Sequence, residues 1–337
     1  MLRSQRRGRD PPCWLSEKEP LVGKRRVNFQ RCWLPVSRIG LHRRGVERVN
    51  CGPKLLDLGE KGVYSSYTYN NDDLPMTPDH VYYGGLLLLA LLMLLEWLRR
   101  PARYQSGDAA TNLLMYAGYL LIGLVWLDIL FRIYYSVWQY RLFDFGPWWL
   151  DPASSRFWLL WGALFVLEDF CFYWFHRGSH KLAFFWAAHV THHSSKFFNL
   201  STALRQSWFP FITFFFWLPL PLIGFDPLMV ISMQLINLAY QAFLHSETDP
   251  WPRAFGWIFN TPTHHRVHHA SNADIVDRNF GGTLIIWDRL FGTFASTDQP
   301  IHYGVRPDPG SRNPLWLQIH GWVELARRLL PKRSTEQ

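Results

Sequence analysis

The distribution of histidine constrains this chain more than any other feature. Ten of the fourteen histidines lie between His176 and His269, in fewer than a third of the 337 residues. They form four groups, of which the first is an H-x-x-x-H pair and the second and fourth each contain an H-x-x-H-H motif: His176 and His180; His189, His192 and His193; His245; and His264, His265, His268 and His269. On a helix, positions i, i+3 and i+4 share one face. Each H-x-x-H-H motif would therefore direct three imidazoles towards one place.

Neutral imidazole is the commonest metal ligand in proteins and suits iron, copper, nickel and zinc. Histidines that only satisfy hydrogen bonds in a core would not explain two H-x-x-H-H motifs and an H-x-x-x-H. Eight patterned histidines also exceed the four ligands of a tetrahedral zinc site. The sequence therefore predicts two metal ions.

Five apolar runs surround these motifs and predict an all-α integral membrane protein with four to five transmembrane or re-entrant helices. They cover residues 81–98, 113–136, 157–175, 208–225 and 227–244. Asp128 and Arg132, four residues apart, can pair within the second run. The last two runs read as a hairpin with a turn at 224–227, whose first arm Pro219 and Pro221 make irregular, so a re-entrant hairpin stays open.

The basic residues predict an orientation. If Arg99, Arg100 and Arg103 are cytoplasmic, the third run delivers His176 and His180 to the cytoplasmic side, and the hairpin returns His245 to it. All four histidine groups then meet in a helical cap at one membrane face. We therefore expect a multi-pass protein with a cytoplasmic site, in a bacterial inner membrane or in the endoplasmic reticulum.

The first fifty residues hold thirteen Lys and Arg against four Asp and Glu, which accounts for the whole formal charge of +9. Residues 1–75 show no sustained apolar period, so we expect a basic, disordered extension, with Met76 a possible true start. Beyond it we expect membrane helices and an interfacial loop at 76–156, a catalytic domain at 157–300, and an interfacial helix and tail at 301–337. Nucleic acid is not an expected partner.

Carboxylates inside an apolar helix are costly and usually functional. Asp169 precedes His176 by two helical turns, so we expect it on the ligand face, where it could accept a proton from a ligand imidazole. An internal pair with a nearby arginine is the alternative. Arg205 and Gln206 could contact a lipid head group or an electron donor, or could simply pack at the membrane interface, and Trp287 and Asp288 are expected to brace the site from behind.

A site built almost wholly from neutral imidazoles leaves two metals with much of their positive charge. Beside membrane helices, such a di-iron site suits activation of O2 against an aliphatic C–H bond of a lipid. Two other classes stay open: a histidine-lined metal transporter, with ligands near the bilayer midplane, and a membrane zinc hydrolase, although no H-E-x-x-H motif is present.

The order of the histidine motifs resembles the fatty acid hydroxylase/sterol desaturase superfamily of membrane di-iron enzymes. Three stretches are similar to its alkylglycerol monooxygenase branch and bacterial relatives: residues 186–195, 199–207, and 260–269 continuing to 285–294. The resemblance covers about residues 80–300. It implies a lipid hydroxylase or desaturase that uses O2 and an external electron donor, either a protein or a reduced cofactor.

The resemblance also implies the iron ligands, which are His176, His180, His189, His192, His193, His245, His265, His268 and His269. His264 stands one residue ahead of the final triplet and is a further candidate. Lys181 occupies the position after the second histidine, where the alkylglycerol enzymes are expected to carry an acidic residue. The ether-lipid substrate and the pterin reductant of that branch are therefore not carried over to this chain.

Overall fold

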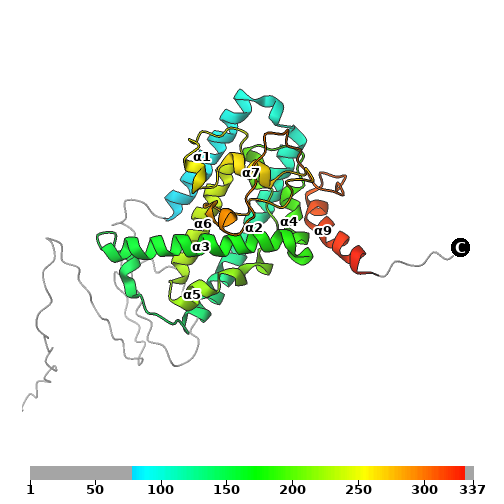
Figure 1. Cartoon of the computed structure of the whole chain (residues 1–337). Helices are drawn as coiled ribbons and strands as arrows, with labels where there is room; N and C mark the ends of the chain where they lie inside the picture. The colour runs from blue at the N-terminus through cyan, green and yellow to red at the C-terminus, as the bar shows by residue number, and fades with distance from the viewer. Residues whose placement is uncertain (1–77, 331–337) are drawn as a thin grey trace, which may run out of the picture. The chain divides into compact units, whose positions relative to one another are not determined.

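The computed structural model describes residues 78–330 (Figure 1). Predictions for residues 1–75, and for the basic tail beyond Leu330, lie outside the described residues. The regular elements of the described part are all helices, with one isolated β-bridge between Phe259 and Leu284 and no strand. Its α-helices are α1 (Pro78–Arg99), α2 (Ser106–Trp138), α3 (Ser155–Lys181), α4 (Ala183–His193), α5 (Pro219–Ile223), α6 (Pro227–Leu244), α7 (Pro262–His268), α8 (Ile286–Leu290) and α9 (Pro314–Leu329).

Three helices of the described part are long and apolar enough to cross a membrane: α2, α3 and α6. They correspond to the second, third and fifth predicted runs, and α1 covers the first. Helix α6 begins with a standard N-terminal capping signal: Asp226 accepts a hydrogen bond from the Leu228 amide, and Pro227 occupies the first helical position. The predicted Asp128–Arg132 ion pair is present, at 2.8 Å. The expected all-α membrane architecture is confirmed.

The fourth predicted run is broken into short pieces. Residues 210–217 form two 3-10 turns, η5 (Pro210–Ile212) and η6 (Phe214–Trp217), before the single turn of α5. Three prolines, Pro210, Pro219 and Pro221, remove backbone donors here, so no continuous helix forms. The first arm of the predicted hairpin is therefore irregular, as its prolines indicate.

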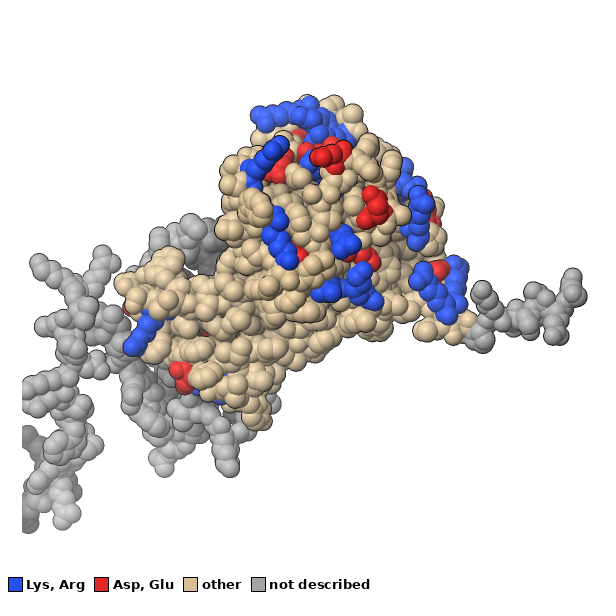
Figure 2. Space-filling view, viewed as in Figure 1, with Lys and Arg blue, Asp and Glu red and all other residues tan. Residues whose placement is uncertain are grey.

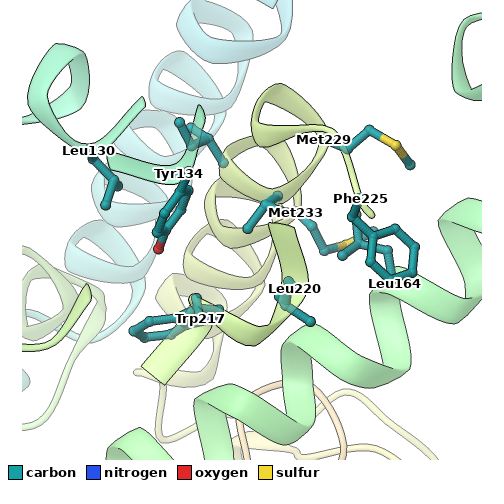
Figure 3. Packing of buried hydrophobic residues seen from close by; sticks show 10 residues of the cluster. Leu130, Tyr134, Leu164, Trp217, Leu220, Phe225, Met229 and Met233 are labelled. Carbon is teal, nitrogen blue, oxygen red and sulfur yellow. The ribbon is translucent and has the colours of Figure 1, made fainter. Parts of the chain in front are cut away.

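The apolar core of the described part lies where α2, α3, α5 and α6 meet. Figure 3 shows Leu130 and Tyr134 of α2 facing Trp217 and the residues of α5 and α6. The remaining buried members are Leu164, Leu220, Phe225, Met229, Val230, Ile231 and Met233. This core lies against α3 as far as Phe175, directly before His176, and against the first half of α6.

Charged side chains are unevenly distributed over the face shown in Figure 2. They gather over the part that carries the end of α1, α7 and α9, while the part around α5 and the first half of α3 is almost uncharged. Many leucines on the apolar helices are exposed, including Leu121 and Leu124 of α2 and Leu159 of α3. An uncharged surface with exposed leucines is what lipid contact requires.

Candidate metal centre

The last two turns of α3 carry the first histidine pair, and a break at Leu182 lets α4 begin at once. Helix α4 then turns back against α3 and presents His189, His192 and His193. His245 directly follows α6, and α7 presents the final motif (Figure 1). Segments far apart in the sequence thus meet, as the predicted topology requires.

The structure sorts nine of the ten candidate histidines into two clusters. We call the first cluster His176, His180, His189, His193 and His268, and the second cluster His192, His245, His265 and His269. Within each cluster, one ring nitrogen per residue lies within 4.8 Å of all the others. Each H-x-x-H-H motif contributes to both clusters, so the clusters are neighbours: the rings of His193 and His269 stack with centroids 4.3 Å apart.

His264 lies outside both clusters. The centroid of its ring lies 5.4 Å from that of Phe294, in a T-shaped arrangement. In the sequence His264 is one position off the helix face that His265, His268 and His269 share. This corrects the inclusion of His264 among the candidate ligands.

Backbone carbonyls accept hydrogen bonds from the outer ring nitrogens of several clustered histidines. Nδ1 of His176 donates to the Phe280 carbonyl at 2.9 Å, and Nδ1 of His268 donates to the Arg278 carbonyl at 3.0 Å. In the second cluster, His192 donates to the Arg205 carbonyl at 3.2 Å and His245 to the Gln241 carbonyl at 2.9 Å. A carbonyl can only accept, so each of these rings carries its proton on Nδ1.

Consequently the Nε2 atoms turned into the clusters carry lone pairs. His192 Nε2 and His245 Nε2 face each other at 3.1 Å, although both rings keep their proton on Nδ1. Within the first cluster, His180 Nε2 and His268 Nε2 are buried without a hydrogen-bond partner. Converging lone pairs repel each other unless a cation lies between them, so these residues fit metal ions.

Protonation does not offer another solution, because burial disfavours the charged imidazole. It lowers the pKa of His192 to about 4. Burial first, and then neighbouring imidazoles, hold the pKa of the other cluster histidines outside the spanning helices well below the ordinary 6.5: His189, His193, His245, His265, His268 and His269. At neutral pH these rings are therefore neutral, which is the form in which imidazole binds a metal.

Asp169 has other partners than the imidazole we expected. Its carboxylate accepts hydrogen bonds from the amides of Thr283 and Leu284, at 2.6 and 3.0 Å, and from the indole of Trp287, at 2.9 Å. Asn237 adds a fourth donor at 3.3 Å. The expected direct contact with a ligand imidazole is thereby corrected, and so is the alternative arginine pair. Asp169 reaches the cluster only through the loop that it holds.

That loop, residues 280–284, carries the acceptor of His176. Asp288 fixes its start by accepting from the amides of Phe280 and Gly281, at 2.8 and 2.7 Å. Gly282 packs so closely that a Cβ atom would lie 2.8 Å from the Asp169 carboxylate. Asp169 and Asp288 therefore clamp both ends of the loop, and Trp287 and Asp288 brace the site as expected.

Sequence reasoning missed Asp277, whose carboxylate accepts from His180 Nδ1 at 3.1 Å and pairs with Lys181 at 3.0 Å. Burial alone would raise the pKa of Asp277, but the hydrogen bonds from His180 and Lys181 bring it below its usual range. Its φ of +60° is left-handed, which Asp tolerates better than most residues. An Asp in a loop ninety-six residues from Lys181 gives no local signal of this contact.

Arg205 is buried, with 2% of its surface exposed, and its guanidinium is hydrogen-bonded within the protein. It cannot contact a lipid head group or an electron donor, which corrects that hypothesis. The side-chain amide of Gln206 donates to the Ala203 carbonyl at 2.7 Å, and the backbone carbonyl of Gln206 accepts from the Gln318 side chain at 2.9 Å.

Comparison with known proteins gives one family model and several relatives that match the part of the chain with the histidine clusters. A family model described as fatty acid hydroxylase matches residues 161–293, which include every clustered histidine. Alkylglycerol monooxygenase of Homo sapiens is 38% identical over 260 residues, covering 73% of this chain and 55% of the relative. The Xenopus tropicalis enzyme of the same name is 35% identical over 260 residues, covering 75% of this chain and 55% of the relative.

A bacterial relative is more distant but matches more of its own length. Ornithine lipid hydroxylase OlsE of Rhizobium tropici is 26% identical over 259 residues, covering 74% of this chain and 75% of the relative. The chain spans about half the length of the alkylglycerol monooxygenases that it matches. No solved structure shows significant similarity to the chain.

Proposed function

Because the chain belongs to the fatty acid hydroxylase/sterol desaturase superfamily, we propose that it is a membrane di-iron enzyme that uses O2 to hydroxylate, or desaturate, an aliphatic C–H bond of a lipid. One observation carries this proposal: nine imidazoles, seven of them from buried residues, converge as two clusters whose inner nitrogens bear lone pairs. The relatives named above are oxygenases or hydroxylases of lipids by name.

The two clusters would each hold one iron, with His176, His180, His189, His193 and His268 as ligands of one and His192, His245, His265 and His269 as ligands of the other. Bound iron would supply the activation of O2, in a reaction that takes R–H, O2, two electrons and two protons to R–OH and water. The chain's own part is to present neutral ligands. Burial keeps their pKa values low, and backbone carbonyls keep their protons on Nδ1.

A groove supports an alkyl chain as the reacting group. It has a volume of about 440 Å³ and lies between α1 and α2, lined by Leu89, Met93, Leu113 and Leu204 among others. Leu204 precedes Arg205, whose carbonyl holds His192. The groove therefore adjoins the support of the second cluster. We propose that it receives part of the lipid chain, which the apolar lining would desolvate.

We further propose that the protein crosses the membrane several times and that the clusters lie at its cytoplasmic face. The ligands follow the C-terminal ends of α3 and α6 or lie on the short helices α4 and α7, and Arg99 and Arg103 end the first apolar segment. A transporter would instead place ligands near the bilayer midplane. An external reductant is required, and Lys181 in the position of the acidic residue favours one that differs from that of the alkylglycerol enzymes.

Metal analysis combined with product detection tests the proposal. Protein purified without oxygen should contain two irons per chain. With a reductant and a membrane lipid extract it should consume O2 and yield a lipid heavier by one oxygen, or lighter by two hydrogens. Purified protein with a single zinc and no iron would refute the oxygenase and favour the zinc hydrolase. Metal loss into vesicles without O2 uptake would favour the transporter.

A further inference from the structure

An ion pair is buried beside the second cluster, between α2 and the turn η4 (Leu200–Leu204). Arg205 Nη2 lies 2.7 Å from Asp108 Oδ1, and the two side chains are only 2% and 7% exposed. Burying two charges is costly unless the remaining hydrogen-bonding atoms are also paired. Here Arg205 Nε donates to Asn112 at 2.9 Å and Nη1 donates to Ser194 at 3.2 Å. Each nitrogen of the guanidinium therefore has a partner.

The other side of this network holds the residues that follow α4. Asp108 Oδ2 accepts from the Ser195 hydroxyl at 2.8 Å, and Asn112 donates to Ser201 at 3.0 Å. Ser194 and Ser195 come directly after His193, whereas Arg205 ends the same segment. The network on α2 thus grips segment 194–205 at both ends.

The end of that segment orients a ligand. The Arg205 carbonyl accepts from His192 Nδ1 at 3.2 Å, which turns Nε2 of this ring towards His245. The carbonyl stays in place only if residue 205 does, and its side chain is anchored on α2, a membrane-spanning helix that supplies no ligand. Support of this kind sets the tautomer and direction of a ligand ring.

We infer that Arg205 and Asp108 are positioning residues of the second cluster: through them the membrane helix α2 fixes the orientation of the His192 ring. The inference rests on the proposed function, since it requires that the second cluster binds metal. The acceptors of the first cluster come from loop residues Asp277, Arg278 and Phe280, none of which contacts this network. Disturbing the ion pair should therefore affect one of the two metals.

The test is the release of metal to a chelator from purified protein loaded with iron. Wild type should hold two irons per chain that leave in two phases. Arg205→Lys cannot reproduce three fixed donor directions, and Asp108→Asn removes the charge. In both variants we expect the metal that leaves in one phase to be bound about 10- to 100-fold more weakly, the range typical of lost ligand support. The other phase should be unchanged.

Asp128→Asn is the matched control, because it breaks the Asp128–Arg132 ion pair on the same helix. The Asp128 side chain is more than half exposed, and this pair is not hydrogen-bonded to the residues that support the clusters. It should release metal as wild type does. Ser194→Ala is the milder variant if the ion-pair variants do not fold: it removes one acceptor of the guanidinium and should speed the same single phase several-fold.

The outcomes separate the inference from the function on which it rests. Wild type that binds fewer than two metals overturns the proposed function. Wild type with two metals, and folded Ser194→Ala, Arg205→Lys or Asp108→Asn protein that releases both as wild type does, overturns the inference alone. A uniform weakening of both phases would show that the pair only supports the fold, and would overturn it as well.

Discussion

At the scale of single residues, each supported imidazole is constrained twice. One nitrogen donates to a fixed acceptor, and the other must face its cluster without a proton. Burial adds to this, since it lowers the pKa of His192 to about 4 and leaves the ring uncharged at neutral pH. If the clusters bind metal as proposed, removing one ring deletes a ligand that the neighbouring residues cannot replace.

We expect His192→Ala and His268→Ala each to lose one iron and to abolish turnover while the protein still inserts, because the apolar spans are untouched. Iron per chain, measured beside the yield of membrane-extracted protein, checks this. His302→Ala is the control, since that side chain lies outside both clusters. Full activity in His268→Ala would show that the first cluster is drawn wrongly.

Asp169→Asn keeps the size of the side chain, but each carboxylate oxygen of Asp169 accepts from two N–H donors, so the NH2 group of asparagine would face two of the four donors. The loop that carries the Phe280 carbonyl should loosen, and His176 should lose its fixed direction. We expect an inserted protein whose first cluster binds iron about 10- to 100-fold more weakly. Chelator release measures this, and an Asn variant with wild-type release and turnover would remove Asp169 from the support of the site.

Which residues form the clusters could be predicted from sequence, because i, i+3, i+4 spacing is a local property. The acceptors could not. Four of them are backbone carbonyls, which carry no sequence signature, and Asp277 is brought to His180 by a loop ninety-seven residues away. Asp169 was correctly singled out as a buried carboxylate, but its partners depend on how residues 283–287 fold against α3.

At the scale of elements, helix α9 is pressed against α4, the helix with three ligands (Figure 1). A Cβ atom on Gly321 would lie 2.3 Å from the Ala187 carbonyl and 2.6 Å from Val190. The close approach of the two helices therefore depends on glycine at this position. Helix α9 was predicted as an interfacial helix, and its exposed Leu315 and Ile319 leave that face available to a membrane surface.

Gly321→Ala should destabilise the protein, because overpacking against a backbone carbonyl costs about 1–3 kcal/mol. Thermal unfolding in detergent would show a lower midpoint. Gly162→Ala on α3 is the control, since its Cβ would meet nothing within 4 Å. There alanine should stabilise by about 0.5–1 kcal/mol through helix propensity alone. Equal stabilisation in both variants would mean that α9 does not pack on α4 as described.

Helix positions followed from the apolar runs, but two boundaries did not. The predicted arm at residues 208–225 forms three short pieces, because proline removes donors that a helix needs; its prolines predicted the irregularity but not where each piece ends. The break between α3 and α4 falls at Leu182, between Lys181 and Ala183, where neither Gly nor Pro marks it. Tertiary packing of α4 on α3 sets this turn, so the sequence gives no local signal.

At the scale of the whole molecule, the histidine groups meet because α3 and α6 end on the same side. The ends of these helices are 63 residues apart in the chain, from Lys181 to Leu244, yet His180 and His245 lie in adjoining clusters. A predicted topology with one ligand-bearing face led to the same arrangement. Topology does not by itself say which side of the membrane that face meets.

Labelling of single cysteines in intact cells decides the orientation. In a background with the four native cysteines replaced by serine, Tyr140→Cys reports on the loop after α2, where Tyr140 is 80% exposed. Asp298→Cys reports on the exposed segment that follows the histidine motifs.

If Arg99 and Arg103 are cytoplasmic, α2 carries the chain outward and α3 returns it. A membrane-impermeant maleimide should then label position 140 from outside and reach position 298 only after lysis. The reverse pattern would place the metal clusters on the outer face, and labelling of both positions from outside would mean that α3 does not cross the membrane.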